Sequence, residues 1–191
     1  NALNTIQEFI LTNQQEIASE YLADFADLMR IYLDQSREDN VSISTEVETL
    51  ELYLRLENLR FNGDLDYDIK VDPLINKDGT HIPVMLLQPY VENSIKHGLL
   101  HKKGDKILVI SFETLADGGI KCVIQDNGVG RITSSKINQS KSIGHKSFAT
   151  GANESRVELI NQNRDKHIRV NIIDLYENEI ASGTNVEIYI N

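Results

Sequence analysis

Apolar side chains recur at helical spacing through the first 36 residues of the chain, with polar side chains between them. Neither glycine nor proline interrupts this pattern. It therefore predicts one long amphipathic helix from Asn1 to about Ser36. Its apolar positions are Leu3, Ile6, Ile10, Ile17, Phe25, Leu28 and Tyr32.

The polar segment SREDNVS, residues 36–42, separates this helix from a second one. Ser42 is a suitable N-cap residue, and the segment FNGDLD at 61–66 ends the second helix. Two amphipathic helices joined by a short polar loop predict an antiparallel hairpin. Such a long hairpin cannot bury both apolar stripes alone, so they are expected to pack against a second copy of the chain or against the rest of this chain.

After Gly63 the pattern changes from helical to alternating, as in strands. The turn ADGG joins two of the alternating segments into a β-hairpin, and the segment ENEIASGT at 177–184 is expected to be the turn before the last strand. The predicted strands are residues 65–71, 106–115, 119–126, 167–176 and 185–191.

Two helices are expected among these strands, one opened by Pro83 and one at 152–163. Residues 131–150 are polar, rich in serine and lysine and almost without periodicity, so they are expected to form a long loop, often a functional lid. The pattern as a whole predicts an α+β fold, with a helical domain at 1–62 and a domain of strands and helices at 63–191.

The composition is that of an ordinary soluble globular protein, with 191 residues, 40% of them hydrophobic, and a formal net charge of −10. This charge argues against a nucleic-acid surface, which needs clustered lysine and arginine, whereas a nucleotide needs only a local positive pocket. The single cysteine, Cys122, excludes a disulfide within one chain. No apolar run is long enough to span a bilayer. Because Asn1 already lies inside a helical pattern, we expect a fragment of a longer protein.

The segment LLQPYVENSIKHG, residues 86–98, reads as an apolar helix with polar groups crowded into its second half. Asn93 and His97 are four residues apart, as are Glu92 and Lys96, so the two pairs lie on adjacent strips of one helix face. Such pairs also occur on ordinary exposed helices, where a Glu–Lys pair merely stabilises the helix.

The segment QDNGVGR favours a binding site over that ordinary interpretation. Asp126 ends a predicted strand, and Gly128 and Gly130 let the backbone approach a ligand closely. A carboxylate in this position suits an adenine, because it accepts a hydrogen bond from the exocyclic amine while apolar walls hold the ring. Many segments of this kind are simple turns.

Two further features lie towards the end of the chain. Gly151 precedes the helix predicted at 152–163, whose free N–H groups could receive phosphate. Thr184 follows a glycine just before the last predicted strand. Either feature also fits an ordinary loop or turn. The loop before Gly151 is locally basic through Lys136, Lys141, His145 and Lys146.

In their order and spacing these features resemble the GHKL (Bergerat) ATP-binding fold of histidine kinases, gyrase and Hsp90. The segment VENSIKHG at 91–98 resembles the N-box of LytS-like sensor histidine kinases, and residues 28–33 and 41–61 resemble that family's dimerisation helices. The resemblance covers essentially all of the chain. It implies an N-terminal helical dimerisation hairpin followed by a GHKL-type α/β sandwich.

The resemblance also implies roles for individual residues. Asn93 would coordinate the Mg²⁺ that bridges the phosphates of ATP, and Glu92 would act as the acid/base or orienting group of phosphoryl transfer. Lys96 and His97 would contact phosphate or ribose, and Asp126 would accept from the adenine amine. The remaining ATP-binding positions that it implies are Gly128, Gly130, Gly151 and Thr184.

As a whole, the resemblance implies a two-component sensor kinase that transfers the γ-phosphate of ATP to a histidine and then to a response regulator. It implies a homodimer through the N-terminal helices. The family's phosphate-accepting histidine lies in a motif like NPHFLFN, whose last asparagine would be Asn1, and none of the five histidines here occupies it. We therefore expect a cytoplasmic portion of a bacterial inner-membrane protein, itself without membrane contact, that binds Mg²⁺ and ATP but does not phosphorylate itself.

One departure keeps an alternative open. The family usually has a glycine two residues after a serine at the end of the lid, and here Ala149 stands there. The alternative is a regulatory binding module with weakened catalysis that acts through its helical hairpin. A gyrase- or Hsp90-type ATPase is a third possibility, which the hairpin ahead of the site disfavours.

Overall fold

The computed structural model describes residues 2–141, 148–162 and 167–191. The chain divides into two compact units, one made of Asn1–Leu65 with Lys77–Val84 and the other of Asp66–Asn76 with Met85–Asn191. The domain boundary expected after residue 62 stays a prediction. Among the residues described, none of the helices combines the length and the apolar character needed to cross a membrane.

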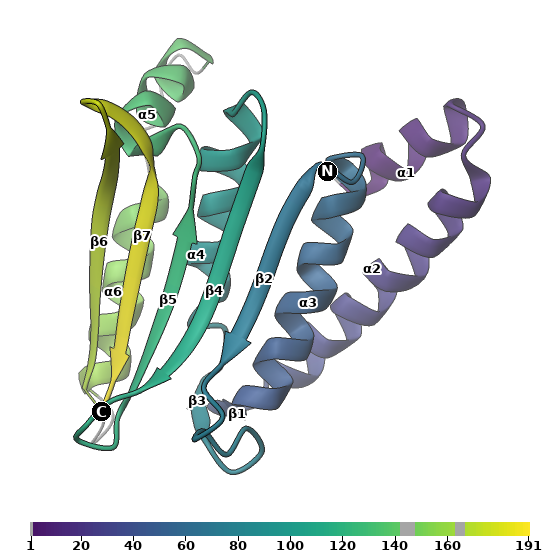
Figure 1. Cartoon of the computed structure of the whole chain (residues 1–191). Coiled ribbons are helices and arrows are strands. Elements are labelled where there is room, and N and C mark those ends of the chain that lie inside the picture. Colours follow the sequence, from purple (N-terminus) through teal and green to yellow (C-terminus); the bar gives the residue numbers. More distant parts are fainter. Residues whose placement is uncertain (1, 142–147, 163–166) are drawn as a thin grey trace. The chain divides into compact units, whose positions relative to one another are not determined.

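The first unit contains three helices, and the prediction of a single helix from Asn1 to Ser36 is wrong (Figure 1). The chain turns at Asn13, whose φ of 62° is a left-handed conformation that asparagine tolerates. Phe9 then packs edge-on against Tyr21 of the next helix, with the ring centroids 6.0 Å apart. The helices are α1 (Ala2–Leu11), α2 (Gln15–Gln35) and α3 (Ile43–Arg60).

Helices α2 and α3 form the antiparallel hairpin that the sequence predicts. Near the end of α2 and the start of α3, the side-chain amide of Gln35 donates to the hydroxyl of Thr49 at 3.0 Å. Near the other end of α3, Arg55 donates two hydrogen bonds to Asp24 of α2, at 2.6 and 2.7 Å. The chain ends α3 at the expected segment, where Gly63 has a φ of 84°.

Ser42 is confirmed as the N-cap of α3, because its hydroxyl accepts from the N–H of Thr45 at 3.1 Å. Pro83 does not begin a helix as predicted; it ends a short strand, and the helix begins at Gln88 with Pro89 in its first turn. The position that tolerates a missing N–H is thus filled by a different proline. A two-stranded antiparallel sheet pairs β1 (Asn40–Ser42) with β3 (His81–Pro83).

The second unit is built on a five-stranded sheet with the strand order β2-β4-β5-β7-β6 (Figure 1). The last three pairs in this order are antiparallel, whereas Figure 1 shows the arrow of β2 pointing the same way as that of β4, so the sheet is mixed. Ile110, Cys122 and Ile188 are fully buried on one face of it. The strands are β2 (Leu65–Val71), β4 (Lys106–Thr114), β5 (Ile120–Asp126), β6 (Ile168–Glu177) and β7 (Ile180–Ile190).

Helices of the second unit cover that buried face of the sheet (Figure 1). The long loop expected at 131–150 is wrong in its first half, which is helical; residues 142–147 lie outside the described residues. This helix shows little periodicity in the sequence because it buries few apolar side chains. The helices are α4 (Gln88–Asn93), continued by the turns η1 (Ser94–Gly98) and η2 (Leu99–His101), then α5 (Gly130–Lys141) and α6 (Phe148–Gln162).

The turn before the last strand is much shorter than predicted. Strand β6 continues to Glu177 and β7 already begins at Ile180, so only Asn178 and Glu179 connect them. Both have positive φ, 49° and 67°, as in the type I′ turns that suit the twist of a hairpin. The consequence is that Thr184 lies inside a strand.

Candidate functional site

Asp126, at the end of β5, is the centre of the candidate site. It is 2% exposed. Its Oδ1 accepts from the N–H of Gly128 at 2.8 Å, and its Oδ2 accepts from the hydroxyl of Ser94 at 2.9 Å. Across the sheet, Asp126 pairs with Thr184 of β7. The structure therefore brings together three segments that lie far apart in the sequence.

Burial raises the pKa of Asp126 above its ordinary value. The hydrogen bonds from Gly128, Ser94 and the backbone of Thr184 act in the opposite direction, as does the positive charge of Lys102, without cancelling the effect of burial. The donors thus hold the carboxyl in place, but they offset only part of the free-energy cost of burying its charged form. An acceptor in this condition can gain from another donor, such as the amine of a ligand.

Close backbone approach at this site requires glycine at three positions, one of which is Gly183, where a Cβ would lie 2.0 Å from the carbonyl oxygen of Asp126. A Cβ on Gly128 would lie 2.5 Å from the backbone of Gly98, and a Cβ on Gly98 would lie 2.9 Å from Oδ1 of Asp126. The N–H of Val129 also donates to the carbonyl of Gly98 at 3.3 Å. Gly128 was predicted at the site; Gly98 was not, although it directly follows the polar cluster of the helix.

Helix α4 and the turn η1 that continues it carry the polar cluster predicted from the sequence. Leu87, Val91 and Ile95 recur every four positions along this stretch and are almost completely buried, whereas Lys96 and His97 are exposed. Asn93 ends α4 and is half-buried, and the next residue, Ser94, begins a π-helical turn. π-helical turns inside helices occur frequently at functional sites.

Glu92 and Lys96 form the i, i+4 ion pair that the spacing predicts. Gln88 also donates to Glu92, at 3.3 Å. These contacts are those of an ordinary helix stabiliser, and the acid/base role of Glu92 stays a prediction. Partial desolvation lowers the pKa of His97, and the nearby charges of His101 and Lys96 act in the same direction, which favours a neutral imidazole.

The turn after β5 is fastened to its surroundings by Asn127 and Lys102. The side-chain oxygen of Asn127 accepts from the N–H of Ile107 at 2.9 Å, and its amide donates to the carbonyl of Asp105 at 3.2 Å. The ammonium of Lys102 donates to the carbonyl of Asn127. Sequence reasoning missed Ser94 and Lys102, because only the folded chain brings them to the turn.

The phosphate end predicted for the site is only partly described. Gly151 was expected just before a helix that starts at residue 152; it lies instead within the first turn of α6, which begins four residues earlier, at Phe148. Lys136 lies exposed on α5, and Lys141 is the last residue of that helix. His145 and Lys146 lie outside the described residues.

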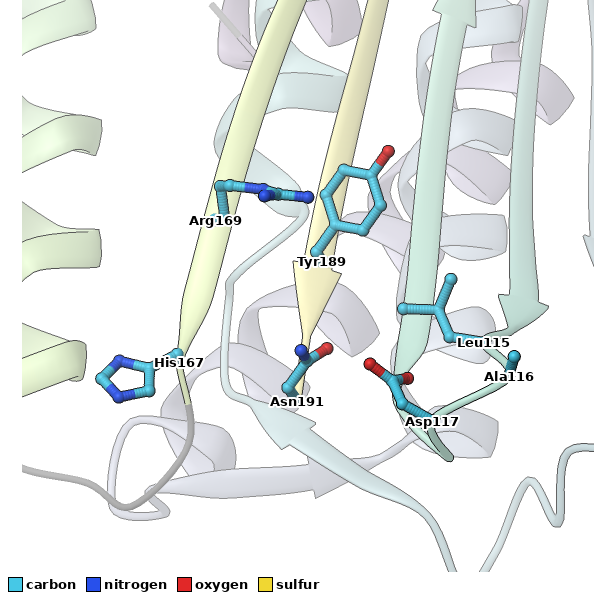
Figure 2. A pocket seen from close by; sticks show the side chains of 7 residues that line it. All are labelled: Leu115, Ala116, Asp117, His167, Arg169, Tyr189 and Asn191. Atoms are coloured by element: carbon cyan, nitrogen blue, oxygen red, sulfur yellow. The ribbon is translucent and has the colours of Figure 1, made fainter.

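A hollow of about 500 Å³ lies at the opposite end of the strands from Asp126 (Figure 2). Figure 2 shows the guanidinium of Arg169 beside the ring of Tyr189, 4.5 Å from its centroid. The pairing of Ile120 with Ile190 at this end, and of Asp126 with Thr184 at the other, separates the hollow from the candidate site. Its lining residues are Leu115, Ala116, Asp117, His167, Arg169, Tyr189 and Asn191.

Comparisons with known proteins agree on one class. The histidine kinase family model matches residues 1–65. The chain is 28% identical over 130 residues to the sensor histidine kinase/phosphatase LytS of Staphylococcus aureus strain MRSA252, and to that of strain Mu50. These matches cover 68% of this chain and 22% of each relative, so the chain spans about a fifth of the length of the curated relatives it matches.

Solved structures show the fold. The blue-light activated histidine kinase of Erythrobacter litoralis EL346 matches with a TM-score of 0.51 at 12% identity, covering 99% of this chain and 62% of that one. The mycobacterial sensor histidine kinase MprB matches with a TM-score of 0.50 at 14% identity, covering 79% and 95%. The predicted α+β fold is therefore confirmed as one that these histidine kinases share, and the resemblance of this chain to the LytS-like sensor histidine kinases is confirmed as well.

Proposed function

We propose that this chain is the ATP-binding catalytic portion of a two-component sensor histidine kinase. It serves the transfer of the γ-phosphate of ATP to a histidine, and from there to a response regulator. The observation that carries this proposal is the junction at Asp126. There the buried carboxyl is hydrogen-bonded both to Ser94, next to Asn93, and to Gly128 of the glycine-rich turn.

At the adenine end, Asp126 accepts a hydrogen bond from the exocyclic amine. Each carboxylate oxygen has two lone-pair sites; Ser94 and Gly128 use one on each oxygen and the backbone of Thr184 uses a third, so one site is left for the amine. Gly128 lets the turn pack closely against the backbone of Gly98 beside the carboxyl, Gly130 gives the turn its positive φ, and Thr184 lies at the same end. Because burial makes the carboxylate costly in the absence of a further donor, the amine is bound in preference to a carbonyl.

At the phosphate end, Asn93 supplies an amide oxygen, which is a hard ligand that suits Mg²⁺. Magnesium is commonly held by one or two protein oxygens together with substrate phosphates, and it supplies charge neutralisation to phosphoryl transfer. Lys96 and His97 contact phosphate or ribose, Glu92 orients the transfer, and the N–H groups around Gly151 receive phosphate.

The first unit serves as the dimerisation element of the kinase. Apolar side chains on α1 and α2 remain exposed, and pairing with a second copy would bury them at the core of a four-helix arrangement. The complete protein is expected to be a bacterial inner-membrane sensor with this chain in the cytoplasm. The exposed apolar residues are Leu3, Ile10, Leu11, Leu22 and Leu33.

Calorimetric titration with a non-hydrolysable ATP analogue, with and without Mg²⁺, tests the nucleotide site. Magnesium-dependent binding that is lost in Asn93→Ala and in Asp126→Asn, with the folded state retained, is the expected result. Absence of binding at millimolar analogue would contradict the proposal and favour a regulatory module acting through the helical hairpin.

The acceptor histidine is expected outside this chain, because none of its five histidines lies in the family's acceptor motif. The purified chain should therefore bind ATP without labelling itself. Incubation with ATP carrying a labelled γ-phosphate, followed by separation of protein from nucleotide, checks this. Stable label on a histidine of the chain would overturn it.

A further inference from the structure

Helix α5 has little apolar surface with which to hold its place. It starts at Gly130, directly after the glycine-rich turn of the candidate site. In its first turn Ile132 is 52% exposed, and among the α5 side chains whose burial is described, the buried one is the small polar Ser134. Because hydrophobic packing normally stabilises a helix in a protein, a polar helix of this kind depends on specific contacts for its position.

The ion pair between Arg131 and Asp174 of β6 is such a contact. Nε of Arg131 donates to Oδ1 of Asp174, and Nη2 donates to Oδ2, both at 2.7 Å. This bidentate geometry fixes the direction of the guanidinium as well as its distance. The arginine side chain is 49% exposed and the aspartate side chain 22%, so the pair is a surface contact whose value lies mainly in geometry.

The sheet register connects this ion pair to the candidate site. Asp174 pairs with Thr184, and Thr184 pairs with Asp126 on the next strand. Directly paired residues of antiparallel strands share one face, so these three form a single row across the sheet. Asp126 is followed by the glycine-rich turn, and Arg131 after this turn binds Asp174, which belongs to the same row.

We propose that Arg131 and Asp174 are positioning residues of the nucleotide site. Their ion pair holds residues 126–131 and the first turn of α5 in the conformation that binds nucleotide. The inference rests on the function proposed above. Gly130, with a φ of 74°, has a backbone conformation that residues other than glycine rarely adopt, directly before Arg131. Without the ion pair, part of the binding free energy would go into ordering this segment.

The test is a titration of the same ATP analogue in the presence of Mg²⁺ against the wild-type chain and matched variants. Arg131→Ala should raise Kd about fivefold, which corresponds to about 1 kcal/mol. Arg131→Lys should fall between this variant and the wild type, because an ammonium replaces the bidentate fork by a single point contact.

Lys121→Ala is the matched control. It removes another ion pair of the same sheet, in which Nζ of Lys121 lies 2.8 Å from Glu187. The control should leave Kd unchanged even where it lowers the free energy of unfolding, which urea denaturation measures for all variants. In Asp174→Ala, and in the double variant with Arg131→Ala, Kd should rise by the same factor as in Arg131→Ala alone, since one interaction is lost in each.

The possible outcomes separate the inference from the proposed function. If the wild-type chain does not bind the analogue, the proposed function itself fails. If the wild type binds and Arg131→Ala binds equally well, only the positioning role is overturned. Equal weakening in Arg131→Ala and Lys121→Ala would likewise overturn it, because it would show a general effect of stability. Additive effects of Arg131→Ala and Asp174→Ala would show that the two residues do not act as a pair.

Discussion

Replacement of Ser94 by alanine isolates the hydrogen bond that joins the polar helix segment to Asp126. The hydroxyl donates to Oδ2 over 2.9 Å, and the two residues are 5% and 2% exposed. A hydrogen bond to a charged group contributes about 1.5–3 kcal/mol, and here water cannot easily replace the lost donor. We therefore expect Ser94→Ala to lower the free energy of unfolding at neutral pH by about this amount.

The size of this loss should depend on pH in a defined direction. Burial raises the pKa of Asp126 and the Ser94 bond opposes that rise, so the variant should have a still higher pKa. At a pH between the unfolded and the folded pKa of Asp126, the folded chain keeps a proton on this carboxyl that the unfolded chain has released. The contribution of Asp126 to the free energy of unfolding therefore falls as pH rises through this range. The loss of unfolding free energy caused by Ser94→Ala should be largest above the folded pKa that Asp126 has in the variant, and should shrink at lower pH.

Urea denaturation at several pH values, monitored by circular dichroism, measures the effect. Ser111→Ala provides the control, because the hydroxyl of Ser111 donates to Glu113 at 3.1 Å in an exposed position of the same sheet. The control should cost less than about 0.5 kcal/mol at every pH. An equal, pH-independent loss in both variants would refute the reasoning that burial gives the Ser94 bond its value.

Three further results are expected. Gly128→Ala should lower the free energy of unfolding in urea by about 1–3 kcal/mol and abolish binding of the ATP analogue, because the added Cβ would meet the backbone of Gly98. If this variant bound the analogue as tightly as the wild type, the close approach would be contradicted. Leu54→Ala should cost about 2–5 kcal/mol in the same assay, since Leu54 is fully buried, whereas exposed Leu33→Ala should cost little. The hydrogen bonds from Arg131 hold the pKa of Asp174 below its ordinary value. Their contribution to the free energy of unfolding is therefore present above the unfolded pKa of Asp174 and is lost as pH falls through its folded pKa. In Asp174→Asn, the free energy of unfolding measured by urea denaturation at decreasing pH should lack this loss.

Sequence patterns predicted correctly those elements whose structure depends on neighbouring residues in the chain. The alternation in residues 65–71 and 106–115 reflects the two faces of a strand, and both segments form strands at nearly the expected bounds. Ser42 was recognisable because an N-cap depends only on residues within one turn of helix. The helix start was misplaced because Pro83 and Pro89 are both suitable residues for the first turn of a helix. Pro83 instead belongs to β3, which pairs with β1.

Other elements depended on contacts that no local pattern reveals. The helical pattern runs through Asn13 without a sign of the break, which the packing of Phe9 on Tyr21 accompanies. Helix α5 was expected to be a loop because its apolar positions are few. A polar segment of this kind becomes positioned when distant partners are available, and Arg131 finds Asp174 43 residues away.

The sequence by itself predicted the α+β fold and the resemblance to LytS-like sensor histidine kinases, because the segment at 91–98, the turn QDNGVGR and the helical hairpin occur in a characteristic order. It also indicated Asp126 and Gly128 as residues of a site. Only the tertiary structure decided what surrounds Asp126. Ser94 lies 32 residues before it and Thr184 58 residues after it, and both reach its carboxyl through helix packing and strand register. Such contacts depend on the whole sheet, so the partners of a buried charge cannot be read from spacing along the chain.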